Sequence, residues 1–365
     1  MFSMLVVGYL FLGGAGAGAL VVLSLLECAN AQRRFGYAAD RTRLGRTFAG
    51  RAMGSLRVES SRHAGAPHYY EGGYSQAAAL EARRRHGRGG ISRALALPGA
   101  FFSYAWPACL LALALGVLCL VADLGRPDRL FVLILHPQPT AMTVGAYALV
   151  VALAVSVAFS VGATFDGIEI TPAIVYALGC VGLLSGAVCA AYTGVLLSSL
   201  ASILFWQTWL LPALFAVSSF SCGIALVMLA AAFVQARQVF VRPLRWLARA
   251  DSALIVVEAV ALAALVAWGL AGEGTRLAAH ALFAGDLRWT FWGGVVVLGL
   301  AVPFAMERFV AHGNYSTQLL WVAMLVLVGG FVLRVCIVGT AAYDVTQMPD
   351  LMYGLAGSIS GSAAV

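Results

Sequence analysis

The sequence predicts an all-α integral membrane protein, built as a helix bundle with eight transmembrane helices. The first observation is composition: 61% of the 365 residues are hydrophobic and 11% are charged, and the mean hydropathy is +0.89. The second is that the apolar residues form runs long enough to cross about 30 Å of hydrocarbon at about 1.5 Å per helical residue. Together these observations exclude a soluble globular protein.

Eight apolar runs define the expected spans. They cover about residues 3–27, 99–122, 140–163, 172–198, 208–235, 252–271, 289–311 and 316–343. The first run lacks a basic stretch before it and a small-residue cleavage site after it, so we expect a retained helix rather than a secretory signal. The expected organisation is transmembrane helix 1 in residues 1–29, an Arg-rich cytoplasmic loop in 30–98, helices 2–8 in 99–343 and an outer-side tail in 344–365.

Arginine sets the expected orientation, since the sequence has no lysine. The 30–98 loop holds 13 of the 23 arginines against four acidic residues, and the loop after helix five adds Arg237, Arg242, Arg245 and Arg249. The connections on the other side hold only Arg126, Arg129, Arg276 and Arg288. By the positive-inside rule the arginine-rich loops face the cytoplasm. We therefore expect a multi-pass protein of the cytoplasmic (inner) membrane, with both termini and residues 123–140 on the outer, periplasmic side.

The basic loop at 30–98 has more than one interpretation. Its arginines, interspersed with histidine and tyrosine, resemble a nucleic-acid-binding composition. Anionic lipid headgroups, however, lie within reach of the same arginines. We expect a solvated, partly disordered cytoplasmic loop beside membrane lipid, with a partner-binding element as the alternative and no nucleic-acid partner.

Cysteine and histidine placement argues against a metal or haem in this protein. The seven cysteines lie inside or at the ends of the apolar runs without a Cys-x-x-Cys pair, so no iron-sulfur cluster or zinc site is expected. Three of the six histidines are in the basic loop, and His136, His280 and His312 lie at or beyond helix ends. A transmembrane haem needs histidine ligands inside helices. If the protein transfers electrons, its redox group must be a diffusible molecule.

Five ordered motifs extend over the sequence outside residues 30–98 and the tail. They are YLFLGGAGAG at 9–18, the DLGRPDR hinge at 123–129, YTGVLL at 192–197, the segment 205–219 with its Phe-Trp, Leu-Pro and Ser-Ser pairs, and GGFVLR at 329–334. In this order they resemble the NrfD/PsrC-like family, the polysulfide reductase type of membrane subunit. The resemblance implies a cofactor-free membrane anchor that exchanges electrons between the menaquinone or ubiquinone pool and an iron-sulfur subunit, with quinol oxidation as the expected direction. It implies two partners, a four-cluster-type iron-sulfur subunit and a molybdopterin or multihaem catalytic subunit.

Four polar side chains are expected in one layer near the outer surface. Tyr9 lies about 9 Å inside helix one at the helical rise, and Tyr192 lies at a similar depth in helix four. Arg334 lies near the outer end of helix eight, and Asp123 ends helix two. Phenol hydroxyls with a nearby carboxylate can bind quinone carbonyls and transfer protons. We expect this layer to form the quinone site, with His136 serving docking or proton release.

Each of these residues also has a structural interpretation. Tyr9 fits the aromatic belt at a membrane interface. Arg334 is costly in hydrocarbon and must be paired, so a structural salt bridge to Asp123 and a catalytic role both stay open. His136, before Pro137, can simply end a surface turn. The glycine spacing of the first motif resembles a dinucleotide fingerprint but lies in a membrane helix without a preceding strand, so we expect close helix packing there.

A second set of acidic residues lies toward the cytoplasm. Glu258 is seven residues beyond Asp251 and therefore within the membrane, where an ionisable side chain indicates function by default. We expect Glu258 in a proton path from the cytoplasm to the quinone site, although a hydrogen bond to a neighbouring helix would explain it equally well. The other acids expected on this path are Glu27, Asp166, Glu169 and Glu307.

The outward-facing surface is expected to dock the iron-sulfur subunit. Residues 123–140 and the Phe205-Trp206 turn place polar hinges and aromatic residues on the arginine-poor side. A secondary transporter or channel subunit is the alternative function, since it also needs many helices and buried charges. Transporters commonly show repeated halves with broken helices, and the sequence contains no convincing internal repeat. A stable complex with an iron-sulfur protein would exclude the transporter.

Overall fold

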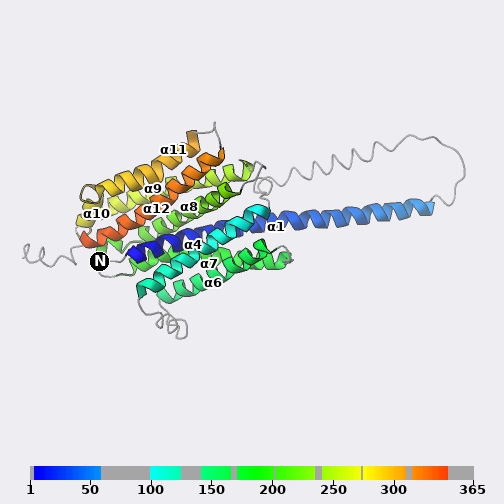
Figure 1. The fold of residues 1–365 in the computed structure, drawn as a ribbon, viewed down its shortest axis with the longest axis horizontal. Helices are drawn as coiled ribbons and strands as arrows, with labels where there is room; N and C mark the ends of the chain where they lie inside the picture. Colours follow the sequence, from blue (N-terminus) through cyan, green and yellow to red (C-terminus); the bar gives the residue numbers. More distant parts are fainter. Residues whose placement is uncertain are drawn as a thin grey trace, which may run out of the picture.

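The computed structural model describes residues 4–58, 99–124, 141–165, 171–200, 203–234, 241–272, 274–309 and 315–343. The elements in these residues are helices that together form an elongated bundle (Figure 1). They are α1 (Met4–Val58), α4 (Gly99–Leu124), α6 (Ala141–Thr164), α7 (Pro172–Ser198), η2 (Leu204–Trp206), α8 (Leu210–Phe233), α9 (Val241–Ala271), α10 (Arg276–Phe283), η3 (Thr290–Ala301), α11 (Val302–Phe309), α12 (Tyr315–Gly339) and η4 (Thr340–Tyr343).

Eight helices in the described residues are long and apolar enough to cross a membrane, which confirms the predicted number of spans. The spans are Met4–Ala31, Phe101–Asp123, Thr143–Thr164, Pro172–Ser198, Leu210–Phe233, Leu244–Ala271, Thr290–Arg308 and Gln318–Ala342. The largest difference is in the sixth span, which begins at Leu244 rather than residue 252. Arg245 and Arg249 lie in this first part and are exposed. Their long apolar stems can follow the helix while the charged groups extend to the membrane surface, so these arginines do not end the span.

Helix α1 does not end at residue 29. It continues to Val58, so the first part of the expected 30–98 loop is helical. Residues 30–58 contain no proline, the residue that most strongly interrupts a helix. At about 1.5 Å per residue the helix is about 80 Å long, and Figure 1 shows its C-terminal part projecting from the bundle. Residues 59–98 lie outside the described residues.

Glycines allow α1 to pack closely against its neighbours α4, α7 and α8. A methyl group on Gly16 would lie 2.8 Å from Cγ of Leu113 in α4, and a methyl group on Gly18 would overlap the backbone of Ser219 in α8. Small residues permit such approaches between membrane helices, where dispersion contacts rather than hydrophobic burial hold the helices together. The close packing predicted from the glycine-rich run is therefore confirmed.

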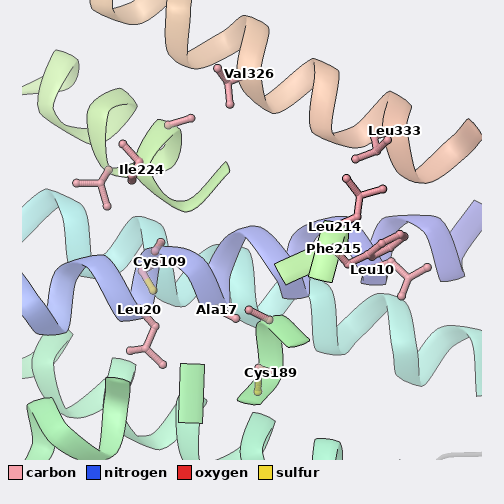
Figure 2. Packing of buried hydrophobic residues seen from close by; sticks show 14 of the residues in the cluster. Leu10, Ala17, Leu20, Cys109, Cys189, Leu214, Phe215, Ile224, Val326 and Leu333 are labelled. Carbon is pink, nitrogen blue, oxygen red and sulfur yellow. The ribbon is translucent and has the colours of Figure 1, made fainter. Parts of the chain in front are cut away.

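The bundle has two halves joined at α1. Helices α1, α4, α6 and α7 form one half, and α8, α9, α12 and the η3–α11 segment form the other (Figure 1). Leu10 of α1, Leu214 of α8 and Leu333 of α12 are almost fully buried where the halves meet (Figure 2). We call the end where α1 begins and α12 finishes the N-terminal end, and the end where α9 begins the opposite end.

The seventh span begins as a π-helix, η3, and continues as α11. π-Helical segments are rare and occur frequently at functional sites. Gly299 of η3 packs directly on α12, because a methyl group on Gly299 would lie 2.8 Å from Cα of Gly329. This contact brings the wide π-helix against the helix that carries Arg334.

Candidate functional site

Arg334 of α12 is a fully buried cation between the two halves of the bundle. Its Nε donates to the carbonyl oxygen of Leu10 in α1 at 3.0 Å, and Nη1 donates to the carbonyl oxygen of Gly330 at 2.7 Å. Nη1 and Nη2 also donate to the hydroxyls of Ser218 and Ser219 in α8, at 3.2 and 3.1 Å. One guanidinium thus joins three helices, a task suited to its fixed fork of five donors.

The expected salt bridge between Arg334 and Asp123 is wrong. Within the described residues, the hydrogen-bond acceptors of Arg334 are carbonyl and hydroxyl oxygens, and the rings of Phe11 and Phe215 lie 5.7 and 5.4 Å from its Cζ. Asp123 is exposed and is the last residue of its span. Arg334 lies eight positions before the end of its own span, about 12 Å deeper. The two side chains therefore occupy different layers.

Ser218 connects Arg334 to an acid. Its hydroxyl hydrogen-bonds Glu258 of α9 as well as Arg334. Glu258 is 6% exposed and lies near the middle of the span Leu244–Ala271. A guanidinium and a carboxyl are therefore linked through one serine near the centre of the bilayer.

A small cavity lies beside this link. Its lining residues come from α8, α9, η3 and α12 and are Ser218, Cys222, Glu258, Val295, Gly299, Leu300, Val326, Gly329 and Gly330. The cavity has room for about one water molecule. Glycines in its wall leave space beside the carboxyl, so a water molecule there can hydrogen-bond to Glu258.

Tyr9 of α1 and Tyr192 of α7 are buried and hydrogen-bonded to each other. They lie five and six positions from the N-terminal end of the bundle in their spans, which places them about 8 Å deep. Gly145 of α6 packs on the Tyr192 ring, where a methyl group would overlap the ring. The bond between the phenols uses one hydroxyl hydrogen, so the second hydrogen remains for another acceptor.

The tyrosine pair and Arg334 meet along α1. Tyr9 directly precedes the residue whose carbonyl accepts the Arg334 Nε–H. A methyl group on Gly13 would lie 3.4 Å from Cε2 of Tyr9, and one on Gly14 would lie 3.0 Å from Nη2 of Arg334. The structure thus brings Tyr9, Tyr192 and Arg334 into one polar region toward the N-terminal end of the bundle.

A pair of acids lies nearer the opposite end. The carboxyl groups of Asp251 in α9 and Glu307 in α11 are close enough to interact with each other. The Ser221 hydroxyl donates to Asp251 Oδ1 at 2.6 Å, and the Ser252 hydroxyl contacts both Glu307 Oε2 and the Ala248 carbonyl oxygen. Asp251 is fully buried. It precedes Glu258 by seven positions, about two helical turns and roughly 10 Å, so both carboxyls lie on one face of α9.

Of the remaining predicted acids and the histidine, the structure describes Glu27 and Asp123. Glu27 is half-buried in α1, four positions before the end of its span, and Asp123 is exposed at the end of its span. His136, Asp166 and Glu169 lie outside the described residues.

The Phe205-Trp206 turn does not form a docking surface, which corrects the sequence-based expectation. Both side chains are fully buried. The Trp206 Nε1–H donates to the Ile337 carbonyl in the last turn of α12 and to the hydroxyl of Thr340, the first residue of η4, each at 3.2 Å. A buried indole needs such an acceptor, and the end of α12 supplies two. The turn therefore anchors the end of α12 from within.

Residues of these networks that carried no predicted role include Ser218, Ser219 and Asp251. The signal for the serines was a hydroxyl pair inside an apolar helix, since such groups hydrogen-bond across helices in membranes. The signal for Asp251 was its seven-residue spacing from Glu258, which places both carboxyls on one helix face.

The sequence is similar to a family of membrane subunits and to two of its members. The model of the family described as "Polysulphide reductase, NrfD" matches residues 102–345. Protein NrfD of Escherichia coli (strain K12) is 34% identical over 146 residues, which cover 40% of this protein and 46% of that one. The C subunit of polysulfide reductase from Wolinella succinogenes is 29% identical over 242 residues, covering 61% of this protein and 76% of that one.

Proposed function

The chain belongs to the polysulphide reductase NrfD family, and from this premise we propose that it is the quinol-reactive membrane subunit of a respiratory oxidoreductase. It takes electrons from menaquinol or ubiquinol in the inner membrane and passes them to an iron-sulfur subunit. The quinone is a diffusible substrate, and the subunit holds no haem, cluster or metal of its own. A molybdopterin or multihaem subunit completes the complex.

The observation that carries the proposal is the buried Tyr9–Tyr192 pair beside buried Arg334. A quinone needs hydrogen-bond donors at its two carbonyl oxygens and an apolar surrounding. The phenol pair retains one hydroxyl hydrogen. The four described acceptors of Arg334 occupy four of its five N–H groups, which leaves one on Nη2. Both donors lie closer to the N-terminal end of the bundle than to the opposite end.

The phenols also supply a route for protons. Oxidation of a quinol releases two electrons and two protons, and a positioned acid–base group speeds such a transfer. In the proposal the quinol hydroxyl hydrogen-bonds Tyr192, which takes up the quinol proton as it passes its own proton to Tyr9, and Tyr9 in turn releases a proton toward the N-terminal end of the bundle. Arg334, held rigidly by three helices, stabilises the negative charge that develops on the quinol oxygen.

The iron-sulfur subunit docks at the N-terminal end of the bundle. The tyrosine pair lies only about 8 Å below this surface, so electrons have the shortest path to a cluster there. Trp209 and Trp289, which directly precede the spans beginning at Leu210 and Thr290, are 88% and 76% exposed, and the Arg288 guanidinium lies 5.2 Å from the Trp289 ring centroid. Exposed aromatic and arginine side chains are enriched at protein interfaces. Arg245 and Arg249 lie at the opposite end and favour its cytoplasmic placement, which puts the docking surface in the periplasm.

Glu258 belongs to a proton path in this proposal. It lies near the bilayer centre and connects through Ser218 to Arg334. Glu27 and Glu307, with Asp166 and Glu169 outside the described residues, are proposed as acids on the cytoplasmic side of the path. Quinol chemistry is then coupled to proton movement across the membrane.

Purification of the complex tests the proposal. The tagged subunit is extracted from its native membranes in mild detergent, and the clusters of the co-purified protein are followed by electron paramagnetic resonance. Addition of a menaquinol analogue should reduce the clusters. A subunit that purifies without an iron-sulfur protein, or clusters that stay oxidised, would contradict the proposal and favour the transporter alternative.

The position of the partner needs a separate measurement. A photo-crosslinking residue at Trp209 should capture the iron-sulfur subunit, whereas one at Trp246, which is exposed nearer the opposite end, should not. Crosslinks formed only from position 246 would place the partner at the opposite end of the bundle.

A further inference from the structure

The carboxyl groups of Asp251 and Glu307 are neighbours. Each has one oxygen that accepts no hydrogen bond from a described group. Asp251 is fully buried, yet its Oδ2 has no hydrogen-bond donor among the described residues, and the same holds for the buried Oε1 of Glu307. The other oxygen of each carboxyl contacts a serine hydroxyl: Ser221 at Asp251 Oδ1 and Ser252 at Glu307 Oε2. The two carboxyls are nevertheless close enough to interact with each other.

This arrangement favours a positive charge between the carboxyls. A carboxylate only accepts hydrogen bonds, so two ionised carboxylates in contact would repel each other at a site away from water. The described polar groups that act on the pair are Ser221, Ser252 and Glu258, which are neutral or acidic. Because no positive charge acts on the pair within the described residues, we infer that a small ion held by the pair itself supplies it.

We propose that Asp251 and Glu307 form a proton-binding site, in which a single proton is shared between Asp251 Oδ2 and Glu307 Oε1. A proton fits better than a metal ion, because serine hydroxyls already contact Asp251 Oδ1 and Glu307 Oε2 and leave only two carboxyl oxygens for the bound ion. Metal cations such as Ca²⁺ and Mg²⁺ require about six oxygen ligands. The site takes up a proton as one carboxylate becomes a carboxyl, and releases it by the reverse step.

The position of the pair suits proton uptake from the opposite end of the bundle. Glu307 is half-buried and is the residue before the last of its span. Asp251 lies seven positions inside its span, about 10 Å deep, and Glu258 follows about 10 Å further along the same helix face. The pair thus lies between the surface at the opposite end of the bundle, which carries Arg245 and Arg249, and the Glu258–Ser218–Arg334 link. Delivery of the proton to Glu258 rests on the proposed function, whereas the shared proton does not.

Infrared spectroscopy of the resting complex tests the shared proton without quinol. The spectrum of wild type minus that of Asp251→Asn should contain a protonated-carboxyl C=O band that shifts in D₂O. Glu307→Gln should remove the same band, because the new amide donates to the remaining carboxylate. Bands from other buried acids, Glu258 included, cancel in this subtraction. Asp286→Asn, which changes an exposed acid, is the matched control and should leave the band in place.

Three results separate the hypotheses. A band missing from wild type, or retained in both pair variants, would overturn the shared proton. A band that disappears when sodium chloride replaces choline chloride at constant pH would assign the site to a metal cation and equally overturn it. A band that behaves as expected, in a complex whose clusters are not reduced by quinol, would retain the proton site and reject the proposed function.

Discussion

Nη1 of Arg334 donates to Oγ of Ser218 at 3.2 Å, and this hydroxyl also hydrogen-bonds Glu258. The serine therefore separates a buried cation from a buried acid instead of allowing a direct ion pair. A hydroxyl can donate to one group and accept from another, so the link can reorganise when the charge on Glu258 changes. A direct salt bridge would instead hold the carboxylate in its ionised form.

Arg334→Gln should destabilise the folded subunit. Loss of the guanidinium leaves two carbonyls and two hydroxyls with fewer hydrogen-bond donors. Each buried unsatisfied group costs about 1–3 kcal/mol, so we expect the free energy of unfolding to fall by about 3 kcal/mol or more. Thermal unfolding of the detergent-purified complex measures the change. Arg276→Gln alters an exposed arginine and serves as the control. Equal melting temperatures for the two variants would show that the Arg334 network contributes little to stability.

Gly14→Ala should disturb the site through packing alone. The added methyl group would lie 2.6 Å from Ser219 Oγ and 3.0 Å from Arg334 Nη2, so both donor and acceptor must move. Displacements of this size can lower rates tenfold or more, and we expect at least about a tenfold fall in quinol oxidation.

Gly293→Ala provides a matched control for this change. A methyl group there has no neighbour within 4 Å, and alanine favours helix over glycine by roughly 0.5–1 kcal/mol. The Gly293 variant should therefore keep wild-type turnover. Comparable losses in both variants would mean that helix flexibility, rather than contact with Arg334, determines the effect.

The sequence predicted some of these features and could not predict others, for physical reasons. The spans and the close approach of Gly16 and Gly18 follow from hydropathy and residue size, which are local properties. The partners of Arg334 do not, because backbone carbonyls and serine hydroxyls are present throughout membrane helices and only the fold selects which ones meet a cation. An aromatic pair at a helix boundary, such as Phe205-Trp206, has the same pattern whether it faces lipid, partner or core.

Glu258→Gln should uncouple proton movement from electron transfer. Glutamine keeps the shape and the hydrogen bond to Ser218 but cannot carry a proton, so proton translocation by proteoliposomes should fall while electron transfer in uncoupled vesicles persists. Asp286→Asn is again the control for loss of one acid. Normal proton translocation by the Gln variant, or no charge movement in wild type, would leave Glu258 with a structural role only.

Tyr192→Phe should slow quinol oxidation far more than it lowers the amount of folded subunit. The substitution keeps the ring that packs on Gly145 and removes one hydroxyl, whose hydrogen bond to Tyr9 contributes about 1 kcal/mol to stability. Loss of a positioned proton-transfer group costs about 10²-fold or more in rate. Tyr104→Phe, at a side chain that is 55% exposed, makes the same chemical change outside the site. Quinol oxidation rates normalised to folded complex decide the question: the Tyr104 variant should match wild type, and an unchanged rate for the Tyr192 variant would remove this phenol from the quinone site.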